Sequence, residues 1–271
     1  MKVRVPASIA NLGPGFDLLA MAVDLWLEVE AEPAEKPEWR FEGEGADVLQ
    51  KTVNPISNLA LKGVVRSGIP LGVGLGSSAA ARLAALMLSR GEHAAILEEA
   101  TEGEGHPDNA AAAQSGGVVL VLGKHVHRLP APDLEIALLV ANEPYPTEEA
   151  RKVVPKQLSR EDAVFNAGRM ALLVHALHAR RWGLLSTAME DRIHQPHRLQ
   201  LYPWVKGVMT AARYSGAHGA ALAGAGPSVF AFCPPGRGEE VAAAMAESGK
   251  GNGRPLVTRV SEKGMSWEGL R

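Results

Sequence analysis

A glycine-rich loop that runs straight into an alanine- and leucine-rich segment constrains this chain more than any other feature. Its residues are Pro70-Leu71-Gly72-Val73-Gly74-Leu75-Gly76-Ser77-Ser78-Ala79-Ala80-Ala81. The alternating glycines let the backbone adopt positive φ and let a ligand come close to it. Ser77 is placed to cap a helix predicted over 78–90. A helix N-terminus fed by such a loop offers free N–H groups to an anion, most often phosphate.

The loop differs from the two best-known nucleotide motifs. No lysine follows its last glycine, and the spacing G-x-G-x-x-G is absent. The backbone would therefore do most of the phosphate binding, and the Ser78 hydroxyl is suited to a Mg²⁺ ion. We expect an enzyme of phosphoryl transfer rather than a dehydrogenase. The alternative is an ordinary junction between a loop and a helix.

Composition narrows the functional class. The chain has 271 residues, 46% of them hydrophobic and 21% charged, with a formal net charge of −2. No basic field favours nucleic acid or a membrane surface, so neither is expected as a partner. A single cysteine, Cys233, excludes a disulfide framework and is expected in the core. The N-terminal residues read as a strand rather than a signal peptide, and no apolar run is long enough to span a membrane, so we expect a cytoplasmic protein.

Helical and extended patterns alternate without a regular βαβ rhythm, which predicts an α+β fold. A boundary near residue 135 would give two similar halves, with Pro130 to Pro132 as a hinge. The segment 7–15 is expected to be a loop. Strands are predicted over 2–6, 23–31, 118–122, 134–140, 220–223, 229–233 and 255–260. Helices are predicted over 58–65, 78–90, 93–102, 107–113, 164–182, 184–192, 202–215 and 239–247.

Two further segments are rich in glycine and poor in charge. They are Ala10-Asn11-Leu12-Gly13-Pro14-Gly15-Phe16-Asp17 and Leu222-Ala223-Gly224-Ala225-Gly226-Pro227-Ser228. Loops far apart in sequence gain function when a scaffold brings them together. The 70–81 loop resembles the PxxxGLGSSAA motif of the GHMP kinases, and the other two segments resemble that superfamily's first and third motifs, in the expected order.

Within that superfamily the chain resembles the homoserine kinases over essentially its whole length. The segments that carry this closer resemblance are 5–17, His106-Pro107-Asp108-Asn109, Thr147-Glu148-Glu149-Ala150-Arg151 and Pro196-His197-Arg198. The resemblance implies an ATP-binding N-terminal domain, residues 1–135, like the second domain of ribosomal protein S5. It implies a ferredoxin-like C-terminal domain, residues 136–271. ATP would lie between the two, against residues 70–80.

Homoserine is a zwitterion that carries a hydroxyl, and the chain offers groups for each part. Arg151 and Arg198 can present bidentate forks to its carboxylate, and Asp17 can balance its ammonium. The resemblance implies an amino-acid site made of Asn11, Asp17, His106, Thr147, Arg151 and Arg198, with Asn109, Asp17 and Arg198 as catalytic groups. The alternatives are that Asp17 caps a turn, that His106 starts a helix and that Arg151 lies on a solvated face.

The resemblance also implies a Mg²⁺ site in which Glu98 is paired with Ser78, with Glu99 or Glu102 as the next candidates. The general base stays open. Asn109 stands where related kinases carry an aspartate, and an amide cannot accept the proton. The γ-phosphate, Asp17 or Asp108 could accept it instead, because phosphoryl transfer depends mainly on positioning and charge.

The resemblance therefore implies an enzyme that uses ATP and Mg²⁺ to phosphorylate the side-chain hydroxyl of L-homoserine, on the way to threonine. Its partners would be these small molecules, and a homodimer is a further expectation. The alternatives are a GHMP kinase of the mevalonate or shikimate type and a catalytically silent nucleotide-binding relative.

Overall fold

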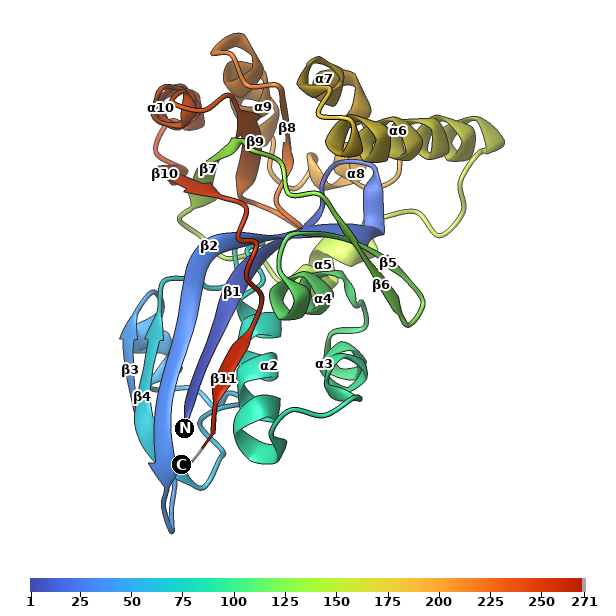
Figure 1. Ribbon diagram of the computed structural model, residues 1–271. Helices are drawn as coiled ribbons and strands as arrows, with labels where there is room; N and C mark the ends of the chain where they lie inside the picture. The colour runs from blue at the N-terminus through green and yellow to red at the C-terminus, as the bar shows by residue number, and fades with distance from the viewer. Residues whose placement is uncertain (270–271) are drawn as a thin grey trace.

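A computed structural model describes residues 1–269, without the side chains of residues 103 and 104. Two β-sheets form its frame (Figure 1). The main path of the first sheet has the order β11-β1-β2-β4-β3, and β5 pairs with both β2 and β6. Its strands are β1 (Lys2–Asn11), β2 (Gly15–Pro33), β3 (Glu38–Gly43), β4 (Leu61–Ser67), β5 (Val118–Leu122), β6 (His125–Leu129) and β11 (Ser266–Glu268).

The long antiparallel hairpin of β1 and β2 carries the first glycine motif. Strand β1 continues to Asn11 and β2 resumes at Gly15, so the loop predicted over 7–15 is wrong except at the tight turn between them. Residues 7–11 are buried and paired with β2, and the register shifts between Pro6 and Ala7 and again at Asn11. A proline at a shift of register needs no ladder hydrogen bond, so it does not stop the strand.

Two helices cover one face of this sheet, and a third packs on them. Helices α2 (Ser77–Arg90) and α4 (Asp108–Ser115) pack on β1 and β2, and α3 (Ile96–Glu104) packs against both helices. A short helix, α1 (Ala46–Leu49), follows β3. The helix predicted over 58–65 is wrong. That region turns and then forms β4, which lies between β2 and β3, where β-branched Val64 and Val65 suit a strand.

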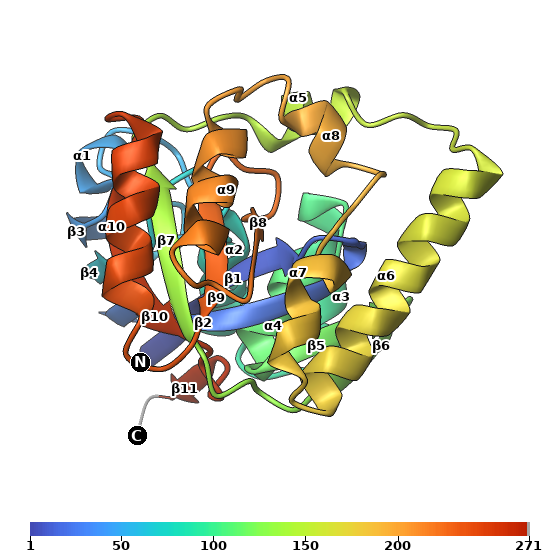
Figure 2. The same cartoon turned by 90° about the horizontal axis from the view of Figure 1, so that it is seen from above.

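The second sheet is antiparallel with the order β10-β7-β9-β8. Its strands are β7 (Glu135–Ala141), β8 (Gly219–Leu222), β9 (Val229–Cys233) and β10 (Gly253–Arg259). Helices α9 (Val205–Tyr214) and α10 (Gly238–Gly249) lie side by side over it (Figures 1 and 2). Along the chain these elements follow as strand, helix, two strands, helix and strand. With this strand order in the sheet they make a ferredoxin-like unit, which confirms the expected fold class.

The segment between β7 and α9 is mostly helical. It contains α5 (Thr147–Lys152), α6 (Arg160–His178), a 3₁₀ turn η1 (Trp182–Leu184), α7 (Leu185–Ala188) and α8 (Gln195–Arg198). Helix α6 begins with Ser159 as its cap, since the Ser159 hydroxyl accepts from the Asp162 N–H. This insertion delivers Thr147, Arg151 and Arg198 to the site described below.

The two parts of the chain are joined at more than one point. The boundary expected near residue 135 falls where β7 begins, but β11 returns from the C-terminal part to pair with β1. Cys233 is fully buried in β9, as expected, and burial raises the pKa of its thiol to about 11. Among the described residues, no helix has the length and apolar character needed to cross a membrane.

Candidate active site

The three glycine-rich segments meet at one place between the two sheets. The Gly224 N–H donates to the Ala10 carbonyl at 3.2 Å, and Asn11 Nδ2 donates to the Gly224 carbonyl at 2.9 Å. A Cβ at Gly74 would lie 2.1 Å from the Ala223 carbonyl oxygen. Only glycine permits this approach, so the loops that the sequence singled out form one structure.

The central loop has the conformation that its glycines predict. Gly72, Gly74 and Gly76 have φ of +71°, +90° and +71°. The capping role expected of Ser77 is wrong, because Gly76 occupies the cap position and Ser77 is the first helical residue. The Ser77 hydroxyl instead accepts from the Gly72 N–H at 3.3 Å, which ties the loop across its base. The N–H groups of the first turn of α2 thus stay available to an anion.

A small cavity of about 90 Å³ opens in front of this loop. It brings together most of the residues predicted for the site. The lining residues are Ala10, Asn11, Asp17, Gly72, Gly74, Gly76, Ser77, Ser78, His106, Asp108, Asn109, Thr147, Arg151, Arg198, Gly224 and Ala225. The other predicted loop residues, Pro70, Leu71, Val73, Leu75, Ala79 and Ala80, do not line it, and all of these but Leu71 are buried supports of the loop.

Asp17 and Arg151 both line the cavity and bind one another directly. Arg151 donates from Nη1 to Asp17 Oδ2 at 3.1 Å and from Nη2 to Oδ1 at 2.5 Å. Asp17 has φ +58°, and its N–H donates to Asn11 Oδ1 at 3.1 Å. A non-glycine residue with this backbone is uncommon and points to a functional constraint. Asp17, the predicted partner of the substrate ammonium, is thus paired in this structure with Arg151, a predicted partner of the substrate carboxylate.

Arg198 is more deeply buried, with 1% of its surface exposed. Its Nε donates to the Ala150 carbonyl at 3.2 Å, and its Nη1 donates to the Gly224 carbonyl and to His194 Nδ1, each at 3.1 Å. Burial, followed by the nearby charge of Arg151, lowers the pKa of Arg198 to about 10, so it stays cationic at neutral pH. Phe16 lies 5.3 Å from both guanidinium groups. With Nε and Nη1 held, Nη2 is the donor that the described residues leave for a ligand.

His194 and Asp191 hold Arg198 in place and were not predicted. His194 Nε2 lies 2.7 Å from the Gly13 carbonyl and donates to it, so Nδ1 is the acceptor for Arg198. Burial lowers the pKa of His194 to about 4, which keeps the ring neutral. The Asp191 carboxylate accepts from the N–H groups of His194 and Gln195 at 3.0 and 2.6 Å. Their position shortly before Arg198 is the only sequence signal for them.

The N-terminus of α4 contributes a second polar cluster. His106 Nδ1 lies 2.9 Å from Asp108 Oδ1, and that oxygen also accepts from the Asn109 N–H at 2.8 Å. The Ser8 hydroxyl donates to Asn109 Oδ1 at 2.9 Å. Ser8 lies against Gly76, at the phosphate loop. The cluster therefore extends from that loop toward Asp17.

The expected pairing of Glu98 with Ser78 is not assembled in the structure. Ser78 lines the cavity, but Glu98 does not. Glu98 is on α3 with its side chain 54% exposed, and its Oε1 lies 2.7 Å from Lys124 Nζ. A magnesium site built from these two residues does not fit the described side chains.

Asp17, His106 and Asp108 have ligand atoms within 4.8 Å of one another. However, both Asp17 oxygens bind Arg151, and His106 Nδ1 is bound to Asp108. Two arginines beside them would also repel a cation. This group is therefore better suited to proton and amino-acid chemistry than to a metal ion.

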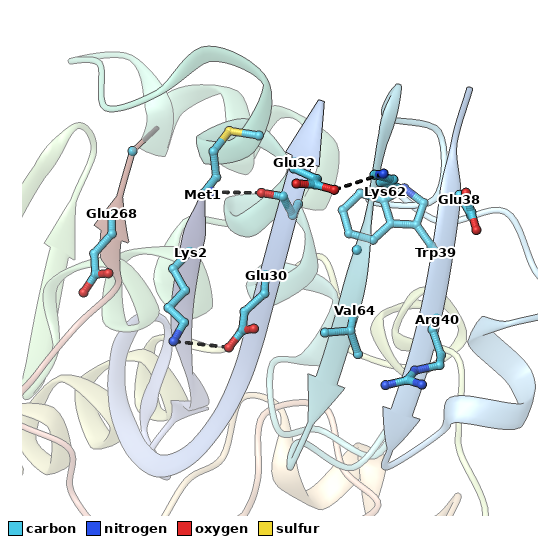
Figure 3. A pocket seen from close by; sticks show the side chains of 13 residues that line it. Met1, Lys2, Glu30, Glu32, Glu38, Trp39, Arg40, Lys62, Val64 and Glu268 are labelled. Carbon is cyan, nitrogen blue, oxygen red and sulfur yellow. Dashed lines mark hydrogen bonds and ion pairs between the residues drawn. The ribbon is translucent and has the colours of Figure 1, made fainter. Parts of the chain in front are cut away.

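A larger hollow, of about 770 Å³, lies elsewhere, on the open face of the first sheet (Figure 3). Two ion pairs cross it, Lys2 with Glu30 at 3.2 Å and Lys62 with Glu32 at 3.0 Å. Its lining includes no residue predicted for the site. We interpret this hollow as a solvent-exposed face of the sheet and not as the active site.

Comparison with known proteins agrees with the motifs. The profile of the GHMP kinases N terminal domain matches residues 43–117, and that of the GHMP kinases C terminal domain matches residues 173–251. A homoserine kinase of Thermus thermophilus is 37% identical over 98% of this chain and 98% of its own length. The chain belongs to the homoserine kinase family. Another member, from Caldanaerobacter subterraneus subsp. tengcongensis, is 36% identical over 100% of this chain and 92% of its own length.

Solved structures give the same result. The crystal structure of a homoserine kinase from Cytophaga hutchinsonii superposes with a TM-score of 0.84 at 29% identity, over 98% of this chain and 96% of that one. A mevalonate kinase from L. major in complex with R-mevalonate has a TM-score of 0.70 at 16% identity. The second likeness shows the shared fold alone. Membership of the family confirms the resemblance that the motifs indicated.

Proposed function

We propose that this chain transfers the γ-phosphoryl group of ATP to the side-chain hydroxyl of L-homoserine, giving O-phospho-L-homoserine on the way to threonine. The observation that carries the proposal is the common cavity. The loop for a phosphate and the Asp17–Arg151 pair for an amino-acid head group line the same small space. The names of the relatives support the same substrate.

In the proposed mode of binding, the Asp17–Arg151 pair opens to admit the zwitterion. The substrate ammonium replaces Arg151 beside Asp17, and its carboxylate receives Arg151 and Nη2 of Arg198. Arg151 is suited to this, because its Nε is buried without a hydrogen-bond partner among the described residues. An unpaired buried donor gains from a ligand that supplies an acceptor. Asn11 and Thr147 complete the amino-acid site.

The triphosphate would lie on the loop 70–77 and the first turn of α2, where positive backbone dipoles meet the charge that develops during transfer. Asn109 would hold the hydroxyl in line with the γ-phosphorus. The proposal includes ATP as its magnesium complex and a cytoplasmic location. Ser78 is the cavity residue suited to the ion, which neutralises phosphate charge when bound.

The head-group site argues against the alternatives. Mevalonate and shikimate have no ammonium, so they would leave the Asp17 carboxylate without a cationic partner from the substrate. The intact loop argues against a silent relative.

An assay coupled to ADP release tests the proposal with homoserine, mevalonate and shikimate as acceptors. We expect ADP formation that requires homoserine and exceeds the rate with either other acceptor by at least about 100-fold, as for a site whose buried polar groups would be left unpaired. ADP formation with none of the acceptors, or a preference for mevalonate, would overturn it.

A further inference from the structure

Helix α2 carries an arginine to which the binding mode above gives no role. In the part of the chain that the structure describes, three buried side-chain atoms lack a hydrogen-bond partner. They are Arg82 Nε, Arg151 Nε and Thr258 Oγ1. The proposed binding mode gives Arg151 a substrate carboxylate, but it leaves Arg82 as it is. A buried donor without an acceptor is costly, so the free protein alone does not account for Arg82.

The two carboxylates that begin the neighbouring helix do not balance this charge. Helix α3 lies beside α2 (Figure 1). Its Glu98 lies 2.7 Å from Lys124 Nζ. Its Glu99 lies 2.6 Å from Nη1 of Arg90, the last residue of α2. Both acidic groups are thus paired with other cations, and Arg82 forms no ion pair with a described residue. Its guanidinium is left for an anion from outside.

Arg82 lies one helical turn after the phosphate loop. It follows Ser78 by four residues, so the two side chains lie on the same face of α2. Ser78 lines the cavity. Long side chains on a helix lean toward its N-terminus, and one turn rises about 5.4 Å, which an extended arginine spans. The guanidinium of Arg82 can therefore reach an anion bound beside Ser78.

The first turn of α2 also suits an external anion. Helices α3, α4, α5, α6 and α10 each have an acidic residue in the first turn, whereas α2 has none. Such a residue would offset the positive end of the helix dipole. In α2 this role is left to a ligand. The loop lacks the lysine of other nucleotide motifs, and Arg82 is the first basic residue after it.

We propose that Arg82 binds the phosphate chain of ATP beside Ser78. This inference rests on the proposed function. The guanidinium donates to oxygens of the β- and γ-phosphates, since its fork of N–H groups matches phosphate oxygens. A side-chain cation then stands next to the serine for which the family resemblance implied an acidic metal ligand, while Glu98 lies outside the cavity. Arg82 holds the phosphates, and no proton passes through it.

The test is equilibrium binding of ATP and AMP to Arg82→Gln, with Arg90→Gln as the matched control. Both variants remove a charge from α2, but Arg90 lies at its far end, in an ion pair with Glu99. We expect R82Q to raise the Kd for ATP about 10- to 100-fold, with and without Mg²⁺, as for a lost charged hydrogen bond. The Kd for AMP, which has only the α-phosphate, should change less than about threefold. R90Q should bind both nucleotides as the wild type does.

A measurement on the wild-type protein keeps the inference testable if R82Q does not fold. Phenylglyoxal modifies accessible arginines, and mass spectrometry of the peptides locates the products. Arg82 is only half-buried, so the reagent reaches it. We expect ATP to slow the modification of Arg82 at least about 10-fold, and homoserine alone to leave it unchanged. Arg90 serves as the internal control, with the same rate whether or not ATP is present.

Three results would overturn the inference. They are a folded R82Q variant that binds ATP within about threefold of the wild type, an equal loss of affinity for ATP and AMP, and a modification of Arg82 that ATP does not slow. If the wild-type protein itself does not phosphorylate homoserine, the proposed function fails first. An active wild type with an unaffected R82Q variant removes only the role of Arg82.

Discussion

At the scale of single residues, the site depends on side chains fixed before any ligand binds. Arg198 is held by two carbonyls and a neutral histidine, and Asp17 by its unusual backbone and by Asn11. Such preorganisation lowers the cost of orienting groups when substrate arrives. Three predictions concern individual positions.

Arg198→Lys should raise the KM for homoserine about ten- to a hundredfold while changing the KM for ATP little. Lysine keeps the charge but lacks the planar fork whose separate nitrogens bind the Ala150 and Gly224 carbonyls and leave one for a carboxylate. The loss corresponds to one charged hydrogen bond of roughly 1.5–3 kcal/mol. Steady-state kinetics on both substrates measures it, with thermal unfolding as the control for folding. A lower kcat with an unchanged KM for homoserine would show that Arg198 acts on phosphate instead.

Gly76→Val should abolish ATP binding. A Cβ there would lie 2.1 Å from Ser8 Oγ, and the residue has φ +71°, which valine adopts only under strain. Gly91 provides a matched control at the other end of α2. It has φ +70°, but in the part of the chain that the structure describes no atom lies within 4 Å of an added Cβ. Equilibrium titration should show normal ATP affinity for Gly91→Val, and normal affinity in a folded G76V variant would refute the loop assignment.

His194 should make the free energy of unfolding depend on pH. Its folded pKa is about 4, below the ordinary value of about 6.5 expected when unfolded. The unfolded chain therefore binds the proton first, and the stability that His194 contributes above pH 6.5 is lost as the pH falls toward 4, on the order of 1–3 kcal/mol. Urea unfolding at pH 7.5 and pH 5 measures this loss. His194→Gln should reduce the difference between the two pH values, and an unchanged difference would contradict the account.

At the scale of elements, the sequence patterns correctly predicted helices and strands whose formation depends on nearby residues. The helix predicted over 78–90 is α2, and the strand predicted over 229–233 is β9. The loop predicted over 7–15 fails because residues 7–11 belong to β1, and the helix predicted over 58–65 fails because residues 61–65 belong to β4. Each becomes a strand because it pairs with β2, β1 within a hairpin and β4 with a more distant segment of the chain. Propensity within a short window does not contain that information.

The candidate site also contains residues that the sequence predicted and residues that it did not. Motif residues such as Asn11, Asp17 and Arg151 line one cavity with the loop, as the family resemblance implied. The role of His194 was not predicted, because it depends on a hydrogen bond to Gly13, 181 positions away. The role of Asp108 toward His106 likewise depends on side-chain orientation rather than on residue type.

Helix α3 provides a prediction at this scale. Glu98 lies outside the cavity and is paired with Lys124, so Glu98→Gln should change the Mg²⁺ concentration for half-maximal activity less than about twofold. An exposed ion pair of this kind contributes at most about 1 kcal/mol. Magnesium titration of kinase activity measures the effect. A shift of tenfold or more would return Glu98 to the metal site expected from the family resemblance.

At the scale of the whole molecule, the two sheets act as a frame that brings the loops together. The first sheet contains the hairpin with the first glycine motif and supports α2. The second sheet contains the turn between β8 and β9, which holds the third glycine motif. The helical insertion after β7 adds the arginines. Strand β11, which returns to the first sheet, ties the two parts together. The cavity therefore depends on the complete arrangement rather than on either half.

The central claim is that this arrangement joins a phosphoryl donor to the hydroxyl of an amino acid. The most direct measurement is ³¹P NMR of a reaction that contains the protein, magnesium ATP and L-homoserine. The account predicts ADP and one new phosphomonoester signal whose phosphorus couples to the two protons of the adjacent methylene group. Release of inorganic phosphate alone would contradict it. Transfer of the phosphoryl group to any atom of homoserine other than the side-chain oxygen would also contradict it.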